Sequence, residues 1–111
     1  RKSVDQSHIA ENIQQYIVSL VLATRNPSEY GLKDLASLIN FGASPRATIF
    51  LATASKSHAF LNKRGFVIPE DVRSVGKSIL RHRIILTYEA EAEEITTEDI
   101  IQRIYESVPT P

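Results

Sequence analysis

Apolar residues in the first quarter of this 111-residue chain recur at spacings of three and four, the period of an α-helix. The pattern predicts a first helix that is capped by Ser3 or Asp5, runs to about Arg25 and is ended by Asn26 and Pro27. We expect one side of this helix to be buried, and the apolar stripe consists of Ile9, Ile13, Tyr16, Ile17, Leu20 and Val21.

Three more helices are predicted downstream. The second covers residues 44–62 and is rich in alanine and serine, so another helix can approach it closely. The third opens with the proline at position 69, which suits a first helical turn, and ends near residues 81–83. Thr96 caps the last helix over residues 97–108, with Asp99 placed as in a capping box.

The remaining segments are short. Residues 32–38 predict a brief helix, and the apolar run 84–88 predicts an extended or irregular connection. Residues 39–41 and 66–68 are β-prone and are expected to pair with each other. The sequence therefore predicts an all-α fold, a small helical bundle of about four main helices with at most a minor two-strand patch.

Composition supports one globular domain over residues 1–111. Hydrophobic residues make up 42% and charged residues 23% of the chain, as in soluble proteins. No cysteine is present, which excludes disulfides and thiolate sites and suits the cytoplasm. No apolar run reaches the length of a membrane span. The chain starts at Arg1 and contains no methionine, so we expect it to be a fragment of a longer protein.

The net charge is zero, yet the charges are segregated. Between residues 56 and 83 there are seven basic side chains against two acidic ones, and between residues 89 and 106 seven acidic side chains against one basic. Two interpretations follow. The two surfaces attract each other within the domain, or they meet head to tail between subunits, as a ring would require.

Chemistry that would make this chain an enzyme is missing. It has no GxxxxGK[ST] phosphate loop, and its histidines lack metal-ligand spacing, so no metal site is expected. His58 is expected to pack in the bundle, and His82 to lie on a surface or interface. The acidic run of residues 89–94 lacks the ligand rhythm of an EF-hand and is expected to be solvated.

The segment around Arg46 carries the sharpest functional signal. Gly42 permits a turn at positive φ, Ser44 is a helix cap, and Pro45 suits the first helical position. Arg46 then lies in the first turn, where the helix dipole disfavours a cation. An arginine placed against that bias is expected to meet a carboxylate, such as that of Asp71, or a phosphate.

Five short motifs extend this signal over nearly the whole chain: Ala23-Thr24-Arg25, Gly42-Ala43-Ser44-Pro45-Arg46-Ala47, Val67-Ile68-Pro69-Glu70-Asp71-Val72, Leu80-Arg81-His82-Arg83-Ile84 and Tyr88-Glu89-Ala90-Glu91. In this order and at this spacing they closely resemble the C-terminal lid of MoxR-type AAA+ ATPases. One departure is Ile68, where the family often has threonine or serine, so the usual hydroxyl cap of the third helix is missing.

The resemblance implies that Arg46 is the second-sensor arginine and lies near the γ-phosphate of ATP, serving either its own subunit or the neighbour. The nucleotide-binding core, with its Mg²⁺-binding acid, would precede Arg1, so ATP and Mg²⁺ belong to the full-length ATPase and none is expected in the fragment, which is not an enzyme alone. The family implies hexameric rings with chaperone-like action on client proteins, often with von Willebrand factor A-type partners. Arg81 and Arg83 are candidates for contacts with the core or a neighbouring subunit.

Two other functions compete with this interpretation. A nucleic-acid module would use Arg64, Arg73, Lys77, Arg81 and Arg83, but zero net charge and the lack of interleaved aromatics argue against it. A protein-interaction bundle without a nucleotide role is the other alternative, and it would apply if no phosphate loop preceded Arg1.

Overall fold

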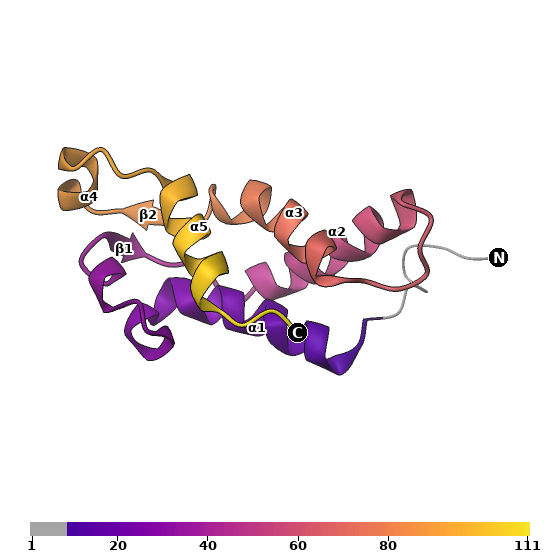
Figure 1. Cartoon of the computed structure of the whole chain (residues 1–111). Helices are drawn as coiled ribbons and strands as arrows, with labels where there is room; N and C mark the ends of the chain where they lie inside the picture. Colours follow the sequence, from indigo (N-terminus) through magenta and orange to yellow (C-terminus); the bar gives the residue numbers. More distant parts are fainter. Residues whose placement is uncertain (1–8) are drawn as a thin grey trace.

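The computed structural model describes residues 9–111, and within them the chain forms an elongated bundle of helices (Figure 1). The predicted caps Ser3 and Asp5 lie outside the described residues. Helix α1 spans Glu11–Arg25, and its predicted stripe is buried from Ile13 onward. It ends at Asn26, directly before Pro27, as the sequence predicts.

A compact connection follows α1. It contains two 3₁₀-helices, η2 (Pro27–Tyr30) and η3 (Lys33–Leu35). Only η3 lies within the short helix predicted over residues 32–38, and it is shorter than predicted. Gly31 between them has φ 74°, a left-handed conformation that glycine adopts without steric cost. Leu32, Leu35 and Leu38 are all buried, so this connection covers part of the core.

Helices α2 (Ala47–Leu61) and α3 (Pro69–Leu80) pack side by side, joined by the loop at one end of the molecule (Figure 1). Alanine and serine on α2 permit this close approach, since Ala47, Ala59 and Ser55 are completely buried. In α3, a Cβ on Gly76 would lie 2.5 Å from the Tyr105 hydroxyl, so the glycine makes room for the last helix.

The strand pair forms with a different partner from the predicted one. Strand β1 (Ile39–Phe41) pairs antiparallel with β2 (Ile85–Leu86), with Ile39 opposite Leu86 and Phe41 opposite Ile85. The expected pairing of residues 39–41 with residues 66–68 is wrong. The amide of Ile68 donates to Asp71 Oδ2 at 2.8 Å, so residues 66–68 lead into α3 as its cap.

Two helices complete the chain. Helix α4 (Tyr88–Ala92), which the sequence pattern did not predict, is capped by the Thr87 hydroxyl, which accepts from the Ala90 amide. Helix α5 (Thr97–Ser107) has the predicted capping box between Thr96 and Asp99. The α4 end, together with β1 and β2, lies opposite the α2–α3 loop (Figure 1).

One apolar core joins all the main helices. It is formed by side chains from α1, α2, α3 and α5, and the completely or almost completely buried larger ones are Ile17, Leu20, Val21, Leu51, Val72, Leu80, Ile100, Ile101 and Ile104. The four main helices and the small strand pair confirm the predicted all-α bundle.

Candidate functional site

Arg46 lies at the very start of α2. The helix begins at Ala47, three residues later than predicted, and Arg46 directly precedes it with helical backbone angles of φ −63° and ψ −22°. The Ser44 hydroxyl accepts a hydrogen bond from the Arg46 amide at 3.1 Å. Ser44 is therefore not the cap residue of α2 that the sequence predicted, because Arg46 has that position. Its hydroxyl instead holds the turn that leads to Arg46, and Pro45 with its fixed φ stiffens that turn.

The Arg46 side chain is exposed and has no partner carboxylate within the described chain. Among residues 9–111, no Asp or Glu oxygen lies within 4.0 Å of its guanidinium. The cation also lies at the positive end of the α2 dipole, which does nothing to stabilise it. The arrangement leaves the donors of Arg46 open to an anion that residues 9–111 do not supply.

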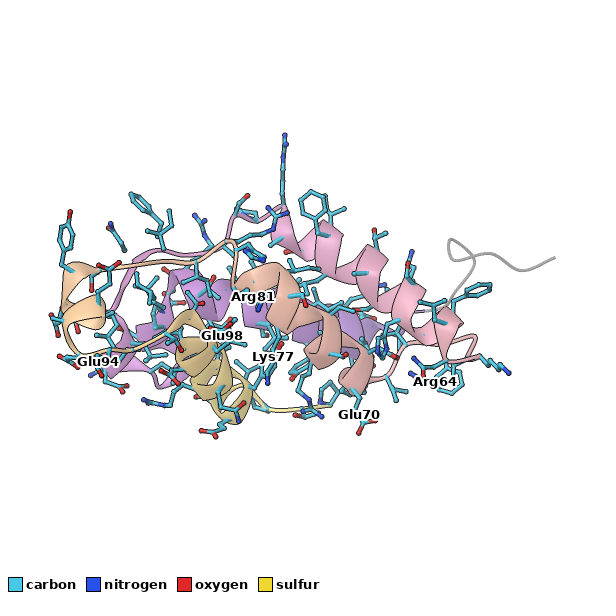
Figure 2. All side chains as sticks on the ribbon, turned by 90° about the horizontal axis from the view of Figure 1, so that it is seen from above. Arg64, Glu70, Lys77, Arg81, Glu94 and Glu98 are labelled. Carbon is cyan, nitrogen blue, oxygen red and sulfur yellow. The ribbon has the colours of Figure 1, made fainter. Side chains whose placement is uncertain are left out.

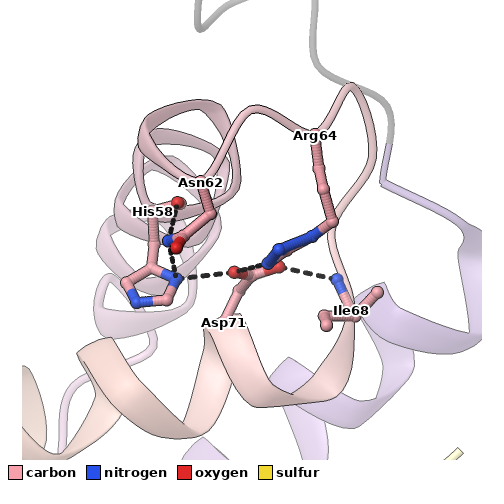
Figure 3. A network of polar contacts seen from close by, with 5 residues as sticks. All are labelled: His58, Asn62, Arg64, Ile68 and Asp71. Atoms are coloured by element: carbon pink, nitrogen blue, oxygen red, sulfur yellow. Dashed lines mark hydrogen bonds and ion pairs between the residues drawn. The ribbon is translucent and has the colours of Figure 1, made fainter.

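Asp71, the carboxylate considered as a partner for Arg46, is engaged elsewhere (Figure 3). Its side chain is completely buried between α2 and α3. His58 Nδ1 lies 2.6 Å from Asp71 Oδ1, Arg64 contacts the same oxygen, and the Ile68 amide donates to Oδ2. A salt bridge between Arg46 and Asp71 is therefore excluded, because the polar contacts of this carboxylate come from the last turn of α2 and from the loop that follows it.

The Asp71 cluster (His58, Arg64, Ile68 and Asp71) has a defined charge state. Burial opposes ionisation of Asp71, but the hydrogen bonds from Ile68, His58 and Arg64 outweigh it and hold the pKa of this carboxyl below its usual value. An ionised carboxylate only accepts, so His58 presents Nδ1–H to it. The bond from the Ile68 amide to Asp71 is the half of a capping box that needs no hydroxyl, and in place of the missing hydroxyl the Ile68 carbonyl accepts from the Asp71 amide at 3.0 Å. The cluster ties α3 to α2.

Gly42 is required for a reason other than the predicted one. Its φ is not positive, so the expectation of a left-handed turn at this position is wrong. A Cβ at Gly42 would lie only 2.3 Å from the Thr24 carbonyl oxygen and 2.9 Å from Arg25 Cα. The glycine instead lets the loop that leads to Arg46 pass directly against the end of α1.

The surface beside Arg46 is apolar and carries a second arginine. Arg83 stacks over the Phe50 ring, with its guanidinium carbon 4.5 Å from the ring centroid. Phe50 is one turn along α2 from Arg46 and is 45% exposed, next to the 66% exposed Ile49. The strand residues Phe41 and Ile85, which face each other in the strand register, are also exposed.

The two candidate interface arginines have different partners. Arg83 joins the Phe50 face, whereas Arg81 lies 3.4 Å from Glu98 of α5 (Figure 2). The Arg81–Glu98 pair also connects the basic and acidic segments, whose ends lie far apart, with Arg64 and Glu94 at opposite ends of the molecule (Figure 2). Among the described residues, the exposed Arg81–Glu98 pair is therefore the one ion pair between the basic and the acidic segment.

Four of the five basic residues considered for nucleic acid have partners within the described part of the domain. Arg64 contacts Asp71, Arg73 donates to the Thr110 hydroxyl, and Arg81 and Arg83 have the partners described above. The four glutamates of the 89–94 run are exposed, as predicted, although Ala90 between them is buried. Within residues 9–111 no group of three or more His, Asp or Glu side chains is placed to hold a metal ion. None of the described helices is long and apolar enough to cross a membrane.

Two hollows on the surface do not have Arg46 in their lining. One of about 670 Å³ is formed by α3 and α5, with Arg73, Lys77 and Tyr105 in its lining. Burial raises the pKa of Tyr105, whose hydroxyl donates to the Arg73 carbonyl, so this phenol stays protonated. The other hollow, of about 290 Å³, lies at the junction of Thr24 and Gly42.

Comparison with known proteins identifies the class of this fold. The model of the AAA lid domain family matches residues 33–104, and the chain belongs to this family. It is 45% identical over 96 residues to Chaperone MoxR1 of Mycobacterium tuberculosis, covering 86% of this chain and 26% of that protein. It is 34% identical over 105 residues to Protein MoxR of Methylorubrum extorquens, covering 89% and 30%. The chain is thus the helical lid of a MoxR-type AAA+ protein.

A solved structure supports the same assignment. The crystal structure of a protein described as a "putative ATPase" from Cytophaga hutchinsonii superimposes with a TM-score of 0.94 at 49% identity, covering 97% of this chain and 33% of that one. The chain spans about a quarter to a third of the length of these relatives. Whatever the whole relatives do beyond the lid therefore depends on parts that this sequence does not contain.

Proposed function

We propose that the chain is the lid of an ATP-driven MoxR-type machine in which Arg46 contacts the γ-phosphate of ATP held by the AAA+ core. The observation that carries the proposal is the exposed Arg46 guanidinium, which has no carboxylate partner within residues 9–111 and lies at the start of a well-anchored helix. Guanidinium groups bind phosphate through two parallel N–H···O bonds, so the residue fits this role.

The remaining nucleotide chemistry belongs to the core of the parent protein. Bound ATP with Mg²⁺ supplies the phosphoryl group, and residues 9–111 contain no carboxylate cluster suited to the metal. The chain's own contribution is a positioned cation and an apolar face. Phe41, Ile49, Phe50 and Ile85 are exposed on α2 and on the strand pair, and this apolar surface fits packing against the core.

The proposal extends to the whole assembly. Hydrolysis removes the γ-phosphate contact, the lid then shifts relative to the core, and the shift drives chaperone-like remodelling of client proteins. The machine acts in the cytoplasm as a hexameric ring, with the apolar face and Arg83 at contacts with the core or a neighbouring subunit, and with von Willebrand factor A-type proteins as partners. The name of one relative, Chaperone MoxR1, supports the chaperone role.

Arg46→Ala in the full-length protein tests the sensor role. Loss of one charge-assisted bidentate contact is expected to lower ATP turnover about 10- to 100-fold. The matched control is Arg103→Ala, which removes an exposed arginine that pairs with Asp34 at 2.7 Å, far along the chain from α2. Equal turnover in wild type and Arg46→Ala would reject the sensor and favour a protein-interaction bundle without a nucleotide role.

A further inference from the structure

We infer that Thr24 and Arg25 are positioning residues for Arg46, an inference that rests on the proposed sensor function. Both lie in the last turn of α1, so they belong to a different helix from the one that begins after Arg46. They hold the backbone of Ala43, three residues before Arg46. These contacts give Thr24 and Arg25 of the Ala23-Thr24-Arg25 motif a structural role, which is to hold the loop that leads to Arg46.

The Thr24 hydroxyl makes the first link. The side chain is 1% exposed, and its Oγ1 donates to the Val21 carbonyl at 2.6 Å within α1. That bond fixes the hydroxyl proton, so the oxygen accepts from the Ala43 amide at 2.9 Å. Ala43 is itself completely buried, and without the hydroxyl its N–H would have no partner.

Arg25 makes the second link from the next residue. Its Nη1 donates to the Ala43 carbonyl oxygen at 3.2 Å, so both backbone polar groups of Ala43 are held by consecutive residues of α1. Gly42 allows this approach, because a Cβ there would overlap the Thr24 carbonyl. We call the contacts of Thr24, Arg25, Gly42 and Ala43 the α1 latch.

Little freedom remains between the α1 latch and Arg46. Ser44 accepts from the Arg46 amide, the ring of Pro45 fixes φ, and the Ala47 amide donates to the Ser44 carbonyl at 2.8 Å. The position of the Arg46 backbone is therefore set from α1 as well as from α2. A cation that must meet a phosphate gains from such preorganisation, since a misplacement of about 1 Å can cost 100-fold in rate.

The test uses the full-length protein with Thr24→Val, which keeps the side-chain shape and removes the hydroxyl. We expect hydrogen exchange of the Ala43 amide to accelerate about 5- to 100-fold, because a buried N–H loses its partner. ATP turnover is expected to fall at least about fivefold. Thr24→Ser restores the hydroxyl and is expected to recover both values, while Thr53→Val makes the same change at an exposed position of α2 and leaves both unchanged.

Combination with Arg46→Ala separates positioning from a general structural role. If Thr24 acts through Arg46, Thr24→Val lowers turnover in the wild type but not in the Arg46→Ala background. Three results would each overturn the positioning role. One is an equal drop in turnover in both backgrounds, and another is unchanged hydrogen exchange of the Ala43 amide in Thr24→Val. The third is normal turnover in Thr24→Val together with reduced turnover in Arg46→Ala. Normal turnover in Arg46→Ala itself would instead remove the sensor function, and the positioning role with it.

Discussion

Replacement of Asp71 by asparagine should reveal how much the Asp71 cluster stabilises the lid. The amide keeps the shape of the carboxylate but removes its charge, and it offers only one accepting oxygen to three donors. At least two of those hydrogen bonds are therefore lost or weakened. Each charge-assisted bond contributes about 1.5–3 kcal/mol.

The net loss of stability is smaller than the sum of these bond energies, because the partners of Asp71 are partly exposed to water. His58 and Arg64 are 33% and 25% exposed, so water replaces part of what they lose. The carboxylate itself is completely buried, and removal of one member of a buried pair is costly. We expect Asp71→Asn to lower the free energy of unfolding by about 2–4 kcal/mol, which corresponds to a decrease of at least about 10 °C in Tm.

A matched control lies in the same chain. Asp99 has the same position in α5 as Asp71 has in α3, and it accepts from the Thr96 amide at 2.9 Å, but it is exposed and pairs with no cation. Asp99→Asn is expected to cost about 1 kcal/mol or less, the usual value of a cap. Urea unfolding followed by circular dichroism measures both variants, with an unchanged m-value as the sign of intact folding. Equal losses in the two variants would refute the buried-charge argument.

Three other predictions concern stability. Because the pKa of Asp71 is lowered in the folded state, its contribution is present at neutral pH and is lost as the pH falls below about 4; the stability gap between wild type and Asp71→Asn should narrow there in acid titrations. Gly42→Ala should lower Tm and expose the Ala43 amide to exchange, since the Cβ overlaps backbone atoms of α1, and an unchanged Tm would contradict the close approach. Leu51→Ala, at a completely buried position, should cost about 2–5 kcal/mol in denaturant unfolding.

The helices could be predicted from sequence because local information defines them. The α1 stripe, the proline that opens α3 and the Thr96–Asp99 box all depend on residues within one or two turns of each other. The turn before Arg46 could also be predicted, because Ser44, whose hydroxyl accepts from the Arg46 amide, is only two residues away.

Long-range partners could not be predicted in the same way. Residues 66–68 and the 85–86 segment are both short and apolar, and nothing local shows which of them meets β1. Thr24 contacts a backbone amide 19 residues away, and a threonine within a helix gives no indication of such a partner in the sequence. His58 and Arg64 carry no sequence signal for Asp71, because their convergence requires the turn between α2 and α3.

With Arg46 held at a phosphate, as proposed above, the geometry of α2 would let this helix act as a lever. Arg46 precedes the first residue of this 15-residue helix, which is about 22 Å long, and the Asp71 cluster clamps its last turns to α3. A tilt of about 10° around the arginine would swing the opposite tip through about 4 Å. Phe60, Leu61 and Phe66 are exposed near that tip, so a small rotation about the proposed phosphate contact would move an apolar surface by several times the radius of a hydrogen atom, enough to separate it from a partner.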